Sequence, residues 1–328
     1  MFYEMDSMNK ISLCFYAHQP TRLRRFYPLE GYLSELSRSL YFDIAQDYSV
    51  FMRMNYEKAL NHILEWLERD TVDLYVYVSG IFIEQCAWSP ELMELLKRIM
   101  KIAEPVCSPY YYSLSCFYPL LTEFCHQVKL HISKIEDIFG KTSSVFINPH
   151  LTYTPELNSV LRDMGVNYVI ARHDEFTGKQ DSTLPKSVSP RMYEDRNWSG
   201  GVLWMDLASP DIYSLPDEIE RRGVDIVPIW ELAEDSGDRG DNHTSSISPS
   251  NSSKTLTQPP LKNHAQSLFY YEVSSLCTYP MSPLERDIYG RLQQFDILLE
   301  MGSPPPTSVI YTLNALSILS DFKRRMWR

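Results

Sequence analysis

Apolar residues along this 328-residue chain fall into short runs that alternate with longer segments of helical spacing. Apolar runs of about four to eight residues predict buried strands, and such runs lie at 11–15, 72–78, 105–112, 144–147, 168–171 and 201–206. Apolar residues three and four apart predict amphipathic helices, which we expect at 32–69, 90–102, 117–139, 154–164, 215–222, 283–301 and 307–326. This alternation indicates an α/β fold with a mainly parallel sheet.

The pattern changes between residues 234 and 264, where Ser, Asn, Thr, Pro and Gly dominate and large apolar residues are scarce. Such a segment cannot bury enough apolar surface to offset the entropy lost on ordering, so we predict that it is disordered. The predicted organisation is therefore an α/β domain over 1–232, a linker over 233–265 and a C-terminal helical segment over 266–328.

Polar side chains follow several predicted strands directly. The strand at 11–15 leads into His18-Gln19-Pro20, the strand at 144–147 leads to His150, and the strand at 201–206 ends in Asp206. Pro20 cannot donate a hydrogen bond to a strand ladder, so the first strand should end there. Ligands of α/β folds bind at the carboxyl ends of parallel strands, so we expect a functional site at this edge.

Composition narrows the class of partner. The net charge of −11 and the pI of about 5.2 argue against nucleic acid or an anionic membrane as a partner. No stretch has the ~18 apolar residues of a membrane span, and no signal peptide is recognisable, which predicts a cytoplasmic protein. The six cysteines form no C-x-x-C pair, so a zinc knuckle is not expected. The sequence does not indicate an oligomeric state.

Three stretches resemble motifs of one enzyme family. His18-Gln19-Pro20 after a strand, and Gly80–Gln85 reading G-I-F-I-E-Q, are similar to the first two motifs of glycoside hydrolase family 57, the amylase and glucanotransferase family. Tyr110–Leu114 is similar to Y-Y-H-S-L, with Tyr112 where a histidine is usual. The resemblance implies an incomplete seven-stranded (β/α) barrel with a C-terminal helical segment, an α-glucan or oligosaccharide ligand, and neither cofactor nor metal. The substrate-binding residues that it implies are His18, Gln19, Glu84, Gln85, Tyr111 and Trp204.

The catalytic positions of the family fall on two further stretches. Residues 148–153, N-P-H-L-T-Y, resemble N-T-E-L-x-Y, and the position of the nucleophilic Glu is His150. Asp206 aligns with the Asp that acts as general acid/base. Retaining hydrolysis needs two carboxylates about 5–5.5 Å apart, one of which forms a covalent ester with the sugar, and an imidazole is a poor substitute. We therefore predict that ordinary retaining hydrolysis is absent or very weak.

Several functions remain open from the sequence. The first is a carbohydrate-binding or degenerate amylase-like protein, a pseudoenzyme with a kept cleft. The second is a glycosidase with an altered two-carboxylate route through Glu84 and Asp206, which for inversion needs about 6.5–9.5 Å between the carboxyl groups. The third is a metal-dependent hydrolase or deacetylase that uses His18 and His150, with an acid as the third ligand. The last is a structural module with a vestigial site.

Overall fold

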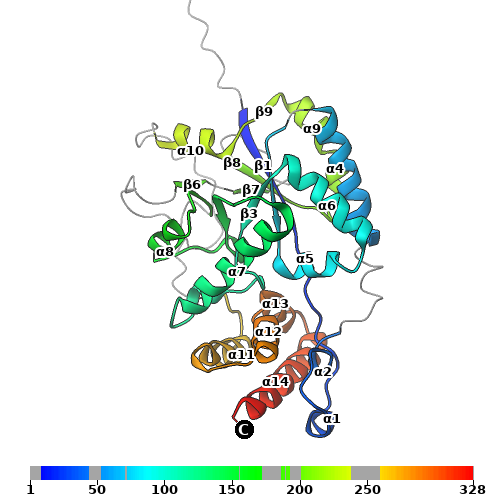
Figure 1. The fold of residues 1–328 in the computed structure, drawn as a ribbon, viewed down its shortest axis with the longest axis vertical. Coiled ribbons are helices and arrows are strands. Elements are labelled where there is room, and N and C mark those ends of the chain that lie inside the picture. The colour runs from blue at the N-terminus through cyan, green and yellow to red at the C-terminus, as the bar shows by residue number, and fades with distance from the viewer. Residues whose placement is uncertain are drawn as a thin grey trace, which may run out of the picture.

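The computed structural model describes residues 9–43, 53–70, 72–154, 156–171, 186–188, 190–192, 201–237 and 259–327. Its centre is one curled sheet of parallel strands in the order β6-β5-β4-β3-β2-β1-β8-β7, with β9 paired to β1 (Figure 1). The strands are β1 (Asn9–Ala17), β2 (Leu74–Val78), β3 (Glu104–Cys107), β4 (Val145–Ile147), β5 (Tyr168–Ile170), β6 (Lys186–Val188), β7 (Pro190–Met192), β8 (Gly201–Asp206) and β9 (Val224–Ile226). The predicted α/β class with an incomplete barrel is confirmed.

The register of the central strands brings their carboxyl ends level. β1 pairs with β2 from Leu13–Leu74 to Ala17–Val78, and with β8 up to Tyr16–Asp206. The residues that follow these strands therefore meet at one edge of the sheet. This edge is where the sequence predicted the functional site.

Helices cover the outer face of the sheet and bury its apolar residues (Figure 1). The helices of the barrel are α4 (Lys58–Arg69), α5 (Gly80–Cys86), α6 (Pro90–Ile102), α7 (Thr122–Phe139), α8 (Leu157–Asp163), α9 (Leu215–Arg222) and α10 (Ile229–Gly237). Their ends follow local signals: the Ser89 hydroxyl caps α6 by accepting the Leu92 N–H, and Gly140 ends α7 with a left-handed φ of 67°. Among the described residues, no helix has the length and apolarity needed to cross a membrane.

A second apolar core joins the two ends of the chain. It is built from α1 (Pro28–Leu33), α2 (Arg38–Tyr41), α11 (His264–Ser275), α12 (Pro283–Leu292), α13 (Phe295–Met301) and α14 (Thr307–Met326). The segment that follows β1 thus leaves the barrel and packs with the C-terminal helices at the lower end of Figure 1. The predicted boundaries at 232 and 265 stay a prediction, and residues 238–258 of the predicted linker lie outside the described residues.

Three sequence predictions of helices need correction. The predicted helix at 32–69 is divided in its described part into α1, α2, the π-helical turn Arg53–Glu57 and α4. The predicted helix at 283–301 is broken at Gln294, whose ψ of 129° is extended, because the next N–H, of Phe295, donates to the Tyr112 carbonyl at 3.0 Å. The G-I-F-I-E-Q stretch forms helix α5, which the Ser79 hydroxyl caps at the Phe82 N–H.

Candidate functional site

His18, the first polar residue after β1, has both ring nitrogens engaged. Its Nδ1 lies 2.8 Å from the Ser79 hydroxyl, and its Nε2 lies 2.8 Å from Oδ2 of Asp296. Ser79 also caps α5, so its position is fixed by the helix that follows β2. Asp296 comes from α13, 278 residues further along the chain. The imidazole is therefore held between the barrel and the C-terminal helices.

Aromatic rings extend from His18 across the inner face of the sheet. The Tyr112 ring stacks on His18 with 4.1 Å between the ring centroids. Tyr77 follows at 6.3 Å from Tyr112, then Trp204 at 6.3 Å from Tyr77, and Tyr16 stacks on Trp204 at 4.6 Å with 9° between the planes. This aromatic row, defined as Tyr16, Trp204, Tyr77, Tyr112 and His18, lines the inner face of β1, β2 and β8 at the edge where the strands end.

Asp206 lies at the end of β8 beside this row. Its Oδ1 accepts the Ala208 N–H at 2.8 Å, and the carboxylate also accepts a hydrogen bond from the Tyr16 hydroxyl. Burial raises the pKa of the Asp206 carboxyl, while the Ala208 N–H, His18 and the Tyr16 hydroxyl act in the opposite direction. The net effect is a raised pKa, which favours the protonated acid relative to an exposed carboxyl group.

His150, at the position of the family nucleophile, has an exposed side chain on a left-handed backbone with φ of 59°. Its ring lies 5.4 Å from that of Phe295 on α13, and its backbone N–H donates to the Tyr112 hydroxyl. The neighbouring acid Glu156 is exposed at the start of α8. Left-handed non-glycine residues are costly and gather at functional sites. Here the backbone of residue 150, rather than its side chain, contacts the aromatic row.

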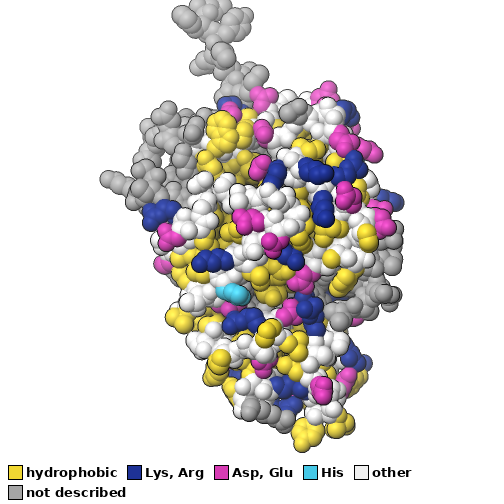
Figure 2. Space-filling view, in the orientation of Figure 1, with side chains coloured by type: hydrophobic (Ala, Val, Ile, Leu, Met, Phe, Trp, Pro, Cys, Tyr) yellow, Lys and Arg dark blue, Asp and Glu magenta, His cyan; other side chains and the backbone are white. Residues whose placement is uncertain are grey.

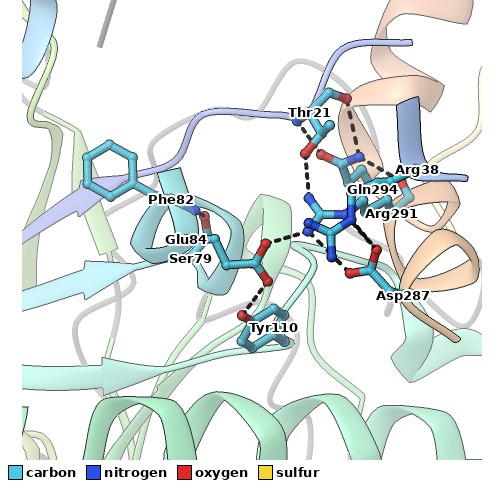
Figure 3. A network of polar contacts seen from close by, with 9 residues as sticks. All are labelled: Thr21, Arg38, Ser79, Phe82, Glu84, Tyr110, Asp287, Arg291 and Gln294. Carbon is cyan, nitrogen blue, oxygen red and sulfur yellow. Dashed lines mark hydrogen bonds and ion pairs between the residues drawn. The ribbon is translucent and has the colours of Figure 1, made fainter. Parts of the chain in front are cut away.

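Glu84 belongs to a different polar network (Figure 3). One carboxylate oxygen accepts the Tyr110 hydroxyl at 2.7 Å, and the other pairs with Arg291 of α12. Arg291 also contacts Asp287 at 3.2 Å and the Thr21 hydroxyl at 3.0 Å. The sequence placed Glu84 at the rim as a sugar ligand or as the group that orients His18. The structure gives that orienting role to Ser79 and Asp296, and it places Glu84 between the barrel and α12.

The other predicted binding residues are largely buried. Tyr111 packs its ring over Gly290 of α12, so closely that a Cβ there would lie 2.2 Å from Tyr111 Cε2. Gln19 is buried at the end of β1. Gln85 is buried on α5, and its Oε1 has no hydrogen-bond partner among the described residues. Of the predicted site residues, the structure brings His18, Trp204 and Asp206 together.

Asp296, Tyr16 and Tyr77 are site residues that sequence reasoning missed. Asp296 lies in a helix of mixed pattern, where an acid is ordinarily taken as part of a solvated face. Tyr16 and Tyr77 lie within predicted strands, and the alternation of side chains along β1 offered a signal, because Tyr16 must share a face with His18.

The metal alternative finds no ligand set in the part of the chain that the structure describes. Within those residues, no group of three or more His, Cys, Asp or Glu side chains is placed to hold a metal ion. His18 has both nitrogens engaged, and His150 lies against Phe295. Two further residues of that prediction, His173 and Asp174, lie outside the described residues.

An incomplete barrel of parallel strands, with an acid and a histidine at its carboxyl edge, is an architecture of carbohydrate-active proteins. The model of glycosyl hydrolase family 57 matches residues 12–197, more than half of the chain. The chain therefore belongs to glycosyl hydrolase family 57. Among curated proteins, none is similar enough in sequence to count as a match.

Solved structures share the fold at low sequence identity. A family 57 branching enzyme from Pyrococcus horikoshii aligns with a TM-score of 0.61 and 12% identity, over 95% of this chain and 88% of that one. A 4-alpha-glucanotransferase from Thermococcus litoralis aligns with a TM-score of 0.48 and 13% identity, over 69% of this chain. This match spans 40% of the glucanotransferase. A family 4 carbohydrate esterase from Bacillus anthracis gives a TM-score of 0.41 and 13% identity, over 69% of this chain and 83% of that one.

Proposed function

We propose that this protein binds an α-glucan or oligosaccharide at the carboxyl ends of β1, β2 and β8, and that it does not carry out retaining hydrolysis. Family membership supports a carbohydrate as the ligand. The branching enzyme of the same family that shares this fold supports an α-glucan as its class.

The observation that carries the second half of the proposal is the state of residue 150. A retaining reaction needs a carboxylate there, about 5–5.5 Å from the acid/base, to form the covalent intermediate. His150 offers an imidazole that is exposed and lies against Phe295. The group of this chain that meets the backbone of residue 150 is the Tyr112 hydroxyl, and burial raises its pKa far above the usual range, so it stays a neutral phenol. Neither group replaces a nucleophilic carboxylate.

The aromatic row supports the binding half of the proposal. Flat rings suit the apolar face of a pyranose, and Tyr and Trp add a polar atom for its hydroxyl groups. Tyr16, His18, Tyr112 and Asp206 are each half-buried, so each leaves part of its side chain open to a ligand. The Asp206 carboxyl then serves as a hydrogen-bond partner of a sugar hydroxyl.

Calorimetric titration with maltooligosaccharides tests the proposal, together with an assay for released reducing ends. We expect wild type to bind without turnover, and Trp204→Phe to weaken binding about tenfold, which corresponds to about 1.4 kcal/mol. Tyr213→Phe is the matched control, because Tyr213 is an exposed aromatic outside the aromatic row. His150→Glu should gain turnover that Asp206→Asn removes. Turnover by wild type would refute the absence of hydrolysis, and unchanged binding by Trp204→Phe would refute the placement of the ligand.

A second candidate is inverting hydrolysis by two acids on either side of His18. The predicted pair was Glu84 and Asp206, but both oxygens of Glu84 are held by Tyr110 and Arg291. Asp296 is the acid that contacts His18, and His18 in turn acts on the pKa of Asp206. This route predicts turnover by wild type with inversion at the anomeric carbon, seen by proton NMR, and its loss in Asp296→Asn. Retention of configuration, or no turnover at all, excludes it.

A further inference from the structure

The helices α1 and α14 form an apolar groove at the end of the molecule away from the strands (Figure 1). Its volume is about 380 Å³. One wall includes Tyr32 of α1, and the other is a single face of α14 formed by Leu313, Leu316, Ser317, Ser320 and Arg324. This face takes no part in the core, because Ala315, Ile318, Leu319 and Phe322 of the same helix fill that role.

The groove continues into further exposed apolar side chains of the same two helices. Leu29, Leu33, Val309 and Ile310 are between 53% and 75% exposed, and Figure 2 shows hydrophobic side chains on the surface at this lower end. With Tyr32 and Leu313 they present on the order of 700 Å² of apolar surface, near the roughly 800 Å² per partner of a standard interface. The largest apolar patch of an ordinary monomer is about 300–600 Å². The size of this surface indicates a protein partner.

We propose that the occupant of the groove is the same groove of a second copy of this chain. The two α14 helices would pack antiparallel about a twofold axis near Ser317. In that arrangement Leu313 meets Ser320 of the partner subunit, and Leu316 meets Ser317 of the partner subunit. Large side chains in the first half of the face thus enter spaces left by serines in the second half. A twofold interface requires such self-complementarity, because the same surface serves both subunits.

The charges of α14 are compatible with this pairing. Arg324 would lie over Ile310 of the partner subunit, where its aliphatic stem covers the apolar side chain while the guanidinium reaches water. The two Arg324 residues would be about 14 helical positions apart, or roughly 21 Å. This exceeds the Debye length of about 8 Å at physiological ionic strength, so they do not repel strongly. Within its own subunit, Arg324 is already paired with Asp321.

Sedimentation velocity of the full chain over a wide concentration range tests the dimer. We expect wild type to dimerise, and Leu313→Asp and Ser317→Arg to be monomers at every concentration. Leu120→Asp, at an exposed leucine of the barrel, is the matched control and should dimerise like wild type. Circular dichroism checks that each variant is folded. A wild type that stays monomeric overturns the proposal, and so does a dimer that survives both α14 substitutions.

Disulfide cross-linking tests the register. A twofold axis near Ser317 brings the two copies of this residue within the Cα separation of a disulfide, about 4.4–6.8 Å. Ser317→Cys should therefore form a covalent dimer under mild oxidation. Thr307→Cys, at the exposed start of α14, would lie roughly 30 Å from its counterpart and should not. Wild type under the same oxidation gives the background from the native cysteines. Equal cross-linking of both variants would contradict the proposed packing.

Discussion

Replacing Arg291 with Met removes the charge at the centre of the network in Figure 3 and keeps most of the apolar stem. The Arg291 side chain is 4% exposed, and its guanidinium pairs with Glu84 and Asp287 and donates to Thr21. Burial alone would lower its pKa, but the two carboxylates outweigh that and hold the guanidinium charged. Arg291→Met therefore leaves two carboxylates without their cation.

The expected loss of stability follows from the exposure of those carboxylates. Removing one partner of a buried ion pair costs about 3–5 kcal/mol, because the remaining charge is uncompensated. The Glu84 and Asp287 side chains are 28% and 18% exposed, so water solvates part of the charge that remains. We expect the free energy of unfolding to fall by about 3 kcal/mol, at the lower end of that range.

Equilibrium urea unfolding, followed by circular dichroism and tryptophan fluorescence, measures this loss. Glu84→Gln should cost about 1 kcal/mol, since the Tyr110 hydroxyl still finds an oxygen, and the double variant should cost less than the sum. Arg98→Met is the matched control: its ion pair with Glu68 is about half exposed, so its loss should stay below about 1 kcal/mol. If Arg291→Met costs no more than Arg98→Met, or if the two network changes are additive, the reasoning fails.

Other expectations concern single buried groups. His131 accepts the Ser108 N–H in the core, and burial lowers its pKa to about 4. Its stabilising contribution is present above pH 6.5 and is lost as the pH falls toward 4, by about 3 kcal/mol in urea titrations, and His131→Gln should flatten that loss. Burial raises the Asp206 pKa, so its charge destabilises the fold at neutral pH; Asp206→Asn should raise the urea midpoint at pH 7, and the gain should shrink in acid. Gly290→Ala forces Cβ into the Tyr111 ring and should cost about 1–3 kcal/mol, with smaller losses in a Tyr111→Leu background; equal losses in both would show that the ring is not the obstacle.

Local signals explain why many element bounds could be predicted. β8, α9 and α14 have the predicted limits, because their apolar patterns are clear and their ends carry turn residues such as Gly223, with its φ of 59°. The site edge could also be predicted, because the carboxyl ends of parallel strands meet at one edge. His18 and Asp206 therefore come together from positions 188 residues apart.

The rest of the site depends on contacts that no local pattern encodes. The break at Gln294 directs Asp296 toward His18, and it is held by hydrogen bonds to Thr21 and to the Tyr112 segment. A periodic pattern predicts one continuous helix there, because it contains no information on distant partners. Glu84 gave a similar difficulty: a motif specifies an acid after β2, but the helical turn of α5 decides that this acid meets Arg291.

The contact between His18 and Asp296 also sets an order of events during synthesis. The two residues are 278 positions apart, so a ribosome that adds about 5–20 residues per second needs roughly 15–55 s between them. During that interval Phe26 and Tyr41 have left the ribosome, but the helices that bury them are not yet made. The growing chain must keep these apolar residues from aggregating, and the histidine acquires its acid partner only when translation is almost complete.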